Sequence, residues 1–376
     1  MGVATGGGYR CQCPHWQTAH GVARVLAKGS AVDNDGSGKT TINDIARLAG
    51  VSKKTVSRVI NRSALLNADT RQSIEAIIRE TGYVPNPQAR ALALRRNFLI
   101  GLVHDNPNAQ MVLGVQQGIL SVLKGTEYEL IVHPVDRGST TMVADIRRFV
   151  ERQRPHGIVL LPPISENNDL AQLCNQLDCR YVRMGSTDLD DAAHMVASDD
   201  RKAVYKAVRY LVDQGHRFIG LIAGPEGFRS AHERFEGFKD AMYDGPMHFN
   251  AQAVARGDYR FESGLAAAEK LLADEPRLTA IFASNDEMAA GALHAAKRRG
   301  LDVPGDLSIV GFDDTAIAAH LWPPLTTVRW PIQDMARAAA RKLLAGTRDA
   351  LPDVAGDEMF PSQLIERASV APRAIV

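Results

Sequence analysis

From residue 99 onward the chain alternates between short apolar runs and longer stretches with helical spacing, and this alternation limits the fold more than any other feature. The apolar runs are Leu99–Val103, Tyr128–Val132, Gly157–Leu161, Tyr181–Met184, Phe218–Ala223, Thr279–Ala283 and Leu307–Phe312. Strands that alternate with helices form parallel sheets with crossover helices on both faces. The length of this part, about 270 residues, suits two such subdomains. We therefore expect an α/β core over residues 99–368, followed by a tail, 369–376.

Polar side chains follow several of these runs, and open α/β sheets bind their ligands at the carboxyl ends of the strands. They are Asp105, Asn106 and Gln110 after the first run, Asn285 with Asp286 after a later one, and Asp313 with Asp314 after the last. Arg234 lies in the segment HERFEGF, which should open a helix. Amides, carboxylates and one Arg suit a neutral polyhydroxylated ligand, because each hydroxyl both donates and accepts. The alternative for these positions is a helix cap after a strand.

The net charge of +1 hides a division along the chain. Residues 39–98 carry eleven basic and four acidic side chains, for a net charge of +7, whereas residues 99–376 have a net charge of −7. A small basic module joined to an acidic body favours a polyanion-binding domain attached to a sensor or catalytic domain. A basic solvated face without any partner would have the same composition.

Residues 39–84 predict a module of three short helices. The first follows Thr41, a good N-cap, and is broken at Gly50. Ser52 caps the second, and the third begins near Asn67 and ends at Gly82. The inward positions are Ile42, Ile45, Ala46, Ala49, Val56, Val59, Ile60, Ile74, Ile77 and Ile78. Two helices joined by a tight Gly turn form a helix-turn-helix, whose second helix enters the major groove of DNA.

The outward face of the second helix is polar and basic. It carries Lys53, Lys54, Thr55, Ser57, Arg58 and Asn61. These side chains suit base edges and phosphates, and Arg58 can pair bidentately with guanine. Any three-helix bundle could show the same apolar spacing, but the basic outer face favours DNA binding.

Two parts of the sequence resemble the lactose/galactose repressor (LacI/GalR) family of bacterial transcription regulators. The family's DNA-binding headpiece is similar to TINDIARLAGVSKKTVSRVINRSALLNADTRQSIEAIIRETGYVPNPQARALA, which starts at Thr41. Its core, shared with periplasmic sugar-binding proteins, is similar in FASNDEMAAGAL, DLSIVGFDD, PPLTTVRWP and RYLVDQGHRFIGLIAGP. The resemblance runs to about Arg367. It implies an all-α helix-turn-helix headpiece with a hinge helix, followed by a two-subdomain α/β core like that of periplasmic binding proteins.

By position, the resemblance makes Lys53 and Lys54 the main base-reading pair, helped by Arg58. The side chains that would hold phosphates or bases are Thr41, Ser52, Thr55, Ser57, Asn61, Asn67, Thr70 and Tyr83. In the core, the matches to the family's effector contacts are Arg234, Asn285 and Asp313, with Tyr259 or Phe228 stacking on a sugar face. The segment LPPISENN departs from the lactose-type pattern, because it has no amide at the expected place. This departure puts a lactose-like ligand in doubt.

Residues 85–98 connect the two parts. Asn86 can cap a helix that begins at Pro87. That helix has only about two turns, too few to be stable alone, so it should fold when DNA and a partner chain hold it. In the family such hinge helices lie as a pair in the minor groove. Leu92 matches the leucine wedged into the central base step, Ala89 the small residue that permits close approach, and Arg90 would contact the backbone. The alternative is a plain linker.

The resemblance also implies an allosteric mechanism. A dimer would bind a palindromic operator, repress carbohydrate-utilisation genes, and be released by a mono- or oligosaccharide. The ending ERASVAPRAIV carries no leucine heptads, so we expect a dimer rather than a tetramer. The alternatives are a regulator with a purine or nucleoside corepressor, and a sugar-binding protein without a role on DNA.

Other classes of protein are disfavoured. The chain has no nucleophile elbow or metal-binding His pair, and GSGKTT lacks the first Gly of a phosphate-binding loop, so we expect no enzyme and no cofactor. Cys11 and Cys13 near His15 and His20 fit no closed zinc module, so we expect no metal. The chain contains no apolar run that spans a bilayer and no secretory signal, which favours the cytoplasm and the nucleoid. Residues 1–38 match nothing in the family and are either a disordered extension or a mis-assigned start.

Overall fold

The computed structural model describes residues 40–61, 66–85, 97–106, 108–187, 189–244, 249–347, 349–350 and 359–373. The chain divides into two compact units, residues 1–87 and residues 88–376. Residues 1–38, expected to be either a disordered extension or a mis-assigned start, lie outside the described residues. None of the helices in the described part combines the length and the apolar character needed to cross a membrane.

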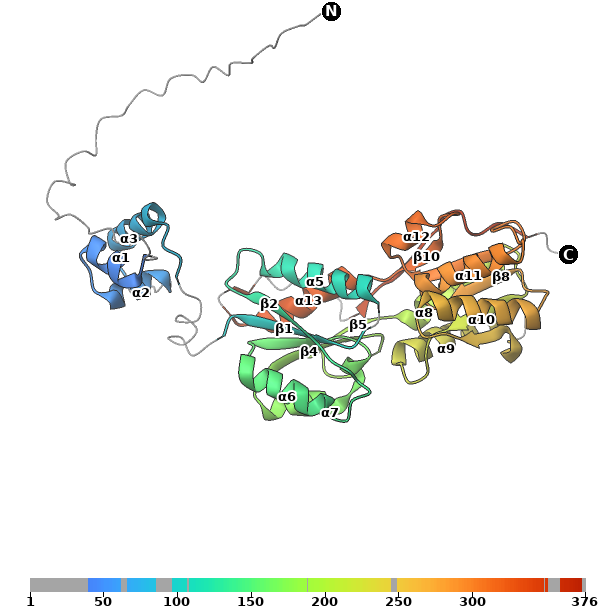
Figure 1. The fold of residues 1–376 in the computed structure, drawn as a ribbon, viewed down its shortest axis with the longest axis horizontal. Coiled ribbons are helices and arrows are strands. Elements are labelled where there is room, and N and C mark those ends of the chain that lie inside the picture. The colour runs from blue at the N-terminus through green and yellow to red at the C-terminus, as the bar shows by residue number, and fades with distance from the viewer. Residues whose placement is uncertain are drawn as a thin grey trace, which may run out of the picture. The chain divides into compact units, whose positions relative to one another are not determined.

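The smaller unit is the three-helix bundle that the sequence predicts (Figure 1). Its helices are α1 (Ile42–Ala49), α2 (Lys53–Ile60) and α3 (Ala68–Thr81). Thr41 and Asp44 form a reciprocal capping box at the start of α1. Gly50 ends α1 with a φ of 63°, in the left-handed region that glycine adopts without strain. The buried centre of the bundle consists of Ile45, Ala46, Val56, Val59 and Ile74.

The larger unit contains two six-stranded sheets, which we call the first and second subdomains. The first sheet has the order β11-β5-β4-β3-β1-β2 and the second has the order β12-β10-β9-β8-β6-β7. The first comprises β1 (Leu99–His104), β2 (Glu129–Pro134), β3 (Gly157–Leu160), β4 (Arg180–Gly185), β5 (Met195–Ser198) and β11 (Met359–Phe360). The second comprises β6 (Ile219–Ala223), β7 (Val254–Arg256), β8 (Ala280–Ala283), β9 (Ser308–Asp313), β10 (Thr326–Arg329) and β12 (Gln363–Ile365). Strand β12 is antiparallel to β10, and the other described pairings are parallel.

Helices cover both faces of each sheet (Figure 1). The first subdomain has α5 (Ala109–Leu123), α6 (Met142–Gln153), α7 (Asn168–Gln176) and α13 (Ile332–Leu344), with a short 3₁₀ turn η1 (Ile164–Glu166). The second has α8 (Asp200–Asp213), α9 (Arg229–Tyr243), α10 (Phe261–Asp274), α11 (Asp286–Arg298) and α12 (Ala316–His320), with a 3₁₀ turn η2 (Ala251–Ala253). Helix α13 packs against α5 although the two are far apart in the sequence, because the chain returns to the first subdomain after β10.

The chain passes between the subdomains after β5, after β10 and between β11 and β12. Two of these crossovers are joined directly, because the indole Nε1 of Trp330 donates to Ser198 Oγ at 2.6 Å. The seven predicted strands are confirmed as β1–β4, β6, β8 and β9, each within two residues of its expected bounds. Strands β5, β7, β10, β11 and β12 were not predicted.

Candidate functional site

Helix α2 presents an exposed basic face. The side chains of Lys53, Lys54 and Arg58 are exposed, and none of them has an ion-pair partner among the residues that the structure describes. Val56 and Val59, on the opposite side of the helix, are buried in the bundle. Ser57 and Asn61 lie partly exposed on α2 and share a hydrogen bond from Asn61 Nδ2 to Ser57 Oγ at 3.3 Å. The exposed cations of α2 are therefore available to a polyanion.

Three of the other expected DNA contacts are helix caps. Thr41 caps α1, Ser52 Oγ accepts from Thr55 N at 3.1 Å, and Asn67 Oδ1 accepts from Asp69 N at 3.0 Å. A cap orients the N-terminus of its helix, and exposed helix N-termini also bind phosphate. Thr70 is partly exposed, and Tyr83 packs partly buried against the core of the bundle. The remaining expected contacts, Ala89, Arg90 and Leu92 of the hinge, lie outside the described residues.

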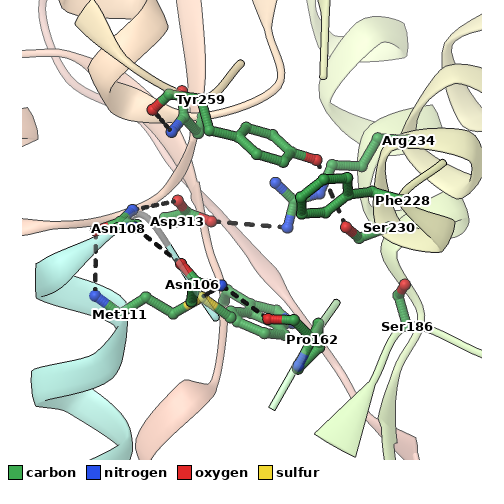
Figure 2. Close-up of a pocket in the computed structure, with 12 residues that line it drawn as sticks. Asn106, Asn108, Met111, Pro162, Ser186, Phe228, Ser230, Arg234, Tyr259 and Asp313 are labelled. Carbon is green, nitrogen blue, oxygen red and sulfur yellow. Dashed lines mark hydrogen bonds and ion pairs between the residues drawn. The ribbon is translucent and has the colours of Figure 1, made fainter. Parts of the chain in front are cut away.

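A pocket lies between the two subdomains of the larger unit (Figure 2). About 470 Å³ of space unoccupied by protein atoms lies within it and at its mouth. Its walls are Asn106, Asn108, Met111, Pro162 and Ser186 from the first subdomain, Phe228, Ser230, Arg234, Tyr259, Asn285 and Asp313 from the second, and Trp330 from a crossover. Its position is typical of small-molecule sites, which favour clefts between subdomains.

Arg234 is the best-fixed residue of the pocket. Its Nε donates to Asp200 Oδ2 at 2.9 Å, its Nη1 donates to the Ser284 carbonyl at 2.5 Å, and its Nη2 lies 3.7 Å from Asp313 Oδ1. The guanidinium also lies 3.7 Å from the centre of the Phe312 ring. Burial alone would lower the pKa of Arg234, but the surrounding anionic groups, led by Asp200, raise it above its ordinary value. The guanidinium is thus charged and held in one orientation.

A chain of hydrogen bonds connects Arg234 to the crossovers. Trp330 donates to Ser198 Oγ, which donates to Asp200 Oδ1 at 2.7 Å, and Asp200 in turn accepts from Arg234. Asp200 is fully buried, so these partners take the place of solvent as its hydrogen-bond donors. These bonds link the pocket to two of the segments that join the subdomains.

Asp313 lies opposite Arg234 in the pocket (Figure 2). Burial raises the pKa of Asp313 to about 8, although the positive charge of Arg234 opposes this shift. Its backbone has a φ of 110° and that of Tyr259 a φ of 72°, both in the region that side-chain-bearing residues seldom adopt. Such conformations concentrate at ligand-binding sites, where the surrounding structure holds them.

The amides of the pocket also have structural roles. Asn285 caps α11 by accepting from Met288 N at 2.9 Å, so the alternative role of a helix cap after a strand holds for this residue. Its Nδ2 also donates to the Tyr259 carbonyl at 2.9 Å. Asn106 donates to the Pro162 carbonyl at 3.0 Å. Asn108 Nδ2 reaches across to Asp313 Oδ2 at 3.4 Å. These bonds fix the amides around the space that a ligand would occupy.

Some expected effector contacts lie beside the pocket rather than in it. Asp105 lines a neighbouring hollow, where its Oδ2 accepts from Arg137 N at 3.2 Å. Gln110 is exposed and lines a different hollow beside α13. Asp314 forms ion pairs with Arg329 and Arg367, which gives it a structural role. Six expected contacts, Asn106, Phe228, Arg234, Tyr259, Asn285 and Asp313, line the pocket itself.

Sequence reasoning missed Asn108, Met111, Pro162, Ser186, Ser230 and Trp330, which also line the pocket. Ser186 is the most informative, because its side-chain oxygen is buried and has no hydrogen-bond partner within the described structure. A buried hydroxyl without a partner is ready to bind a ligand group. Its position directly after β4 was the only available signal in the sequence.

One acidic cluster lies elsewhere in the first subdomain. The donor atoms of Asp190, Asp191 and His194 lie within 4.8 Å of one another. Asp190 already accepts from Tyr181 and Arg183, and Asp191 already contacts His194. The side chains of this cluster therefore already have hydrogen-bond partners within the protein, which gives the cluster a structural role.

Comparison with known sequence families gives two matches. Residues 41–86 match the family described as bacterial regulatory proteins, lacI family, and residues 208–370 match a periplasmic binding protein-like domain. A probable HTH-type transcriptional repressor of Bacillus subtilis (strain 168), ExuR, is 33% identical over 316 residues, which cover 81% of this chain and 91% of that protein.

Two solved structures show the same fold over most of the chain. The lac repressor dimer, bound to operator and the anti-inducer ONPF, has a TM-score of 0.74 and 26% identity, covering 89% of this chain and 100% of that one. The complex of the transcriptional regulator CelR with cellobiose has a TM-score of 0.64 and 29% identity, covering 88% of this chain and 99% of that one.

Proposed function

Since this chain belongs to the lacI family of bacterial regulatory proteins, whose lac repressor binds its operator as a dimer, we propose that it represses carbohydrate-utilisation genes as a dimer on a palindromic operator. The dimer would act in the cytoplasm, where the operator is accessible. A headpiece of residues 39–84, a hinge of residues 85–98 and a core of residues 99–368 are the parts that this function needs.

On the DNA side, α2 enters the major groove. Lys53 and Lys54 read base edges, with Arg58 beside them. The capped helix N-termini at Thr41 and Ser52 hold phosphates, and so do the other polar side chains expected to contact DNA. The cations of α2 are exposed and have no ion-pair partner among the residues that the structure describes, which supports this assignment because ion pairs within the protein would compete with DNA.

On the effector side, the pocket binds a sugar. The observation that carries this proposal is the fixed Arg234, held by Asp200 and facing Asp313, among amides and aromatic rings. Guanidinium and carboxylate groups bind pairs of hydroxyls, and the rings of Phe228 and Tyr259 offer faces for an apolar sugar surface. The binding of cellobiose by CelR supports a saccharide in this chain as well.

The two functions are coupled through the subdomains. A ligand bound in the pocket touches both of them, so it changes their relative orientation and with it the spacing of the two hinges in a dimer. We propose that the ligand is an inducer, which favours the arrangement that releases DNA. The shift in operator affinity is bounded by the ligand's preference for one arrangement over the other.

Thermal melting of the full chain against a panel of sugars and nucleobases tests the proposal. A ligand at about a hundred times its dissociation constant adds roughly 2.7 kcal/mol of stability. We expect a sugar to raise the melting temperature and to lower the affinity of the protein for its operator. An Arg234→Ala variant should keep operator binding and lose the sugar response, whereas Leu92→Ala should lose specific operator affinity. Stabilisation by nucleobases alone would contradict the sugar assignment.

A further inference from the structure

Helix α9, which carries Arg234, begins without a cap of its own. Phe228 occupies the N-cap position and forms no side-chain hydrogen bond there, and the first turn contains no acidic residue. The first backbone N–H groups of a helix have no partner within it and carry a partial positive charge. The first N–H groups of α9 therefore need hydrogen-bond acceptors from another part of the structure.

Glu166 of the first subdomain reaches it from across the cleft. Glu166 closes the turn η1, after the segment that contains Pro162, and both of its carboxylate oxygens accept from Arg229 N, at 3.1 and 3.0 Å. The backbone N–H of Ser230 also donates a hydrogen bond to the Glu166 carboxylate. Burial raises the pKa of Glu166 above its ordinary value, and the bond from Arg229 N and the charges of Arg229 and Arg137 oppose that shift. The carboxylate of one subdomain thus caps a helix of the other.

A second contact crosses the cleft beside the first. The guanidinium of Arg137, which follows β2 in the first subdomain, lies 4.1 Å from the centre of the Phe228 ring. Arg137 is itself held by Asp105, with 3.5 Å between Arg137 Nε and Asp105 Oδ2. Glu166 and Arg137 therefore contact two adjacent residues, Arg229 and Phe228, at the start of α9.

We propose that Glu166 is a latch that holds the subdomains together through the N-terminus of α9, and that it makes the pocket select uncharged sugars over their carboxylate or phosphate counterparts. This inference rests on the proposed effector-binding role of the pocket. The natural place for a ligand anion, a helix N-terminus flanked by Arg229 and Arg137, is occupied by the protein's own carboxylate.

The charges of the pocket agree with this selection. Arg234 is paired with Asp200 and Asp313, and Arg137 is paired with Asp105. Among the buried side-chain polar atoms that line the pocket, the one without a hydrogen-bond partner in the described structure is the neutral hydroxyl oxygen of Ser186. An anionic ligand group at the start of α9, next to the lining residues Phe228 and Ser230, would have to displace Glu166 or approach it closely, and like charges repel strongly where water is largely excluded.

Hydrogen exchange of the ligand-free full chain tests the latch. In the wild type the amides of Arg229 and Ser230 should be protected, and a Glu166→Ala variant should exchange them at least about tenfold faster. Glu226→Ala is the matched control, because Glu226 is exposed and pairs with Arg256 of the same subdomain. Unchanged exchange at the start of α9 in Glu166→Ala would overturn the latch.

Paired probes test the selectivity. Glucose and glucuronate, galactose and galacturonate, and glucose and glucose 6-phosphate differ mainly by the charged group. In the wild type the neutral member of a binding pair should bind at least about tenfold more tightly, and Glu166→Gln should reduce that ratio several-fold while Glu226→Gln leaves it unchanged. A purely structural role of Glu166 would weaken both members equally, and that result, or a wild type that prefers the charged member, would overturn the selectivity.

The outcomes separate this inference from the proposed function. If none of the sugar probes binds, that result counts against the sugar-binding role of the pocket. Hydrogen exchange of the α9 amides would still decide whether Glu166 caps the helix. Operator binding by the wild type tests the proposed regulator without involving Glu166. Loss of protection in Glu166→Ala together with a failure of all DNA binding would leave the latch standing and refute the regulator.

Discussion

Replacement of Arg234 by Met tests the electrostatic centre of the pocket. The substitution keeps an unbranched apolar stem that can pack on Phe312, and it removes the charge that Asp200 and Asp313 share. The Arg234 side chain is only 6% exposed and that of Asp200 is 0% exposed, so solvent cannot replace the lost partner. Asp200 would retain only the hydroxyl of Ser198 as a hydrogen-bond donor within the described structure.

The expected cost follows from this burial. Removing one partner of a buried ion pair typically destabilises a protein by about 3–5 kcal/mol, because the other charge is left uncompensated. The Ser284 carbonyl also loses its donor, which acts in the same direction. We therefore expect Arg234→Met to lower the free energy of unfolding of the larger unit by about 3–5 kcal/mol. Adding Asp200→Asn to this variant should restore a substantial part of that loss.

Urea unfolding followed by tryptophan fluorescence measures this cost. Trp330 is buried in the larger unit, so its emission reports the unfolding of that unit. Arg298→Met is the matched control, because its exposed ion pair with Glu269 should change stability by no more than about 0.5 kcal/mol. A loss below about 1 kcal/mol in Arg234→Met would refute the argument that the charge of Arg234 compensates buried carboxylates.

The pH dependence of the same variant provides a second check. Burial already raises the pKa of Asp313 to about 8 in the presence of Arg234, and removing the cation raises it further. The folded variant then binds more protons than the unfolded chain above the ordinary pKa of an Asp. The wild type and the variant both gain stability from this group as the pH falls below 8, so the penalty relative to the wild type should shrink as the pH falls toward 8 and stay nearly constant from there down to 5. A penalty that grows on acidification would contradict this reasoning.

Three further predictions concern other parts of the chain. Thr41→Ala should lower the stability of the headpiece by about 1 kcal/mol, measured by circular dichroism, because it removes the capping box of α1. Lys54→Ala should reduce the slope of log affinity against log salt concentration by about 1 if Lys54 contacts a phosphate, and should relax sequence preference if it contacts a base. Burial lowers the pKa of His216 to about 4, so the unfolding free energy of the larger unit should fall by roughly 2–3 kcal/mol between pH 6.5 and 4. That pH-dependent loss should be largely absent in His216→Gln.

The elements of the fold that could be predicted have local signals. The caps at Thr41 and Ser52 and the left-handed glycines at Gly50 and Gly82 are specified by neighbouring residues, so the headpiece could be predicted almost to the residue. The strands that were missed depend on distant partners instead. Strand β11 has two residues and β7 has three, and each forms because it pairs with the edge of a longer strand, β5 and β6 respectively. Such short segments have no periodicity that sequence alone could detect.

The pocket was predicted in part for a similar reason. The rule that ligands bind beyond strand ends found Asn106, Asn285 and Asp313, but the same rule also selected Asp105 and Gln110, which lie beside the pocket. A position after a strand gives the location of a residue along the chain and not the direction of its side chain. Trp330 and Glu166 were not found, because their roles depend on the crossovers and on the second subdomain across the cleft.

The central claim is that this chain reads a symmetric DNA sequence through α2 and releases it when a sugar binds. Selection of bound duplexes from a random pool by the full-length protein tests this claim most directly. We predict a two-fold symmetric sequence that is enriched by the wild type, lost by the Lys53→Ala/Lys54→Ala variant, and released by the sugar that raises the melting temperature of the protein. A pool without an enriched sequence, or one enriched equally by the variant, would contradict the account.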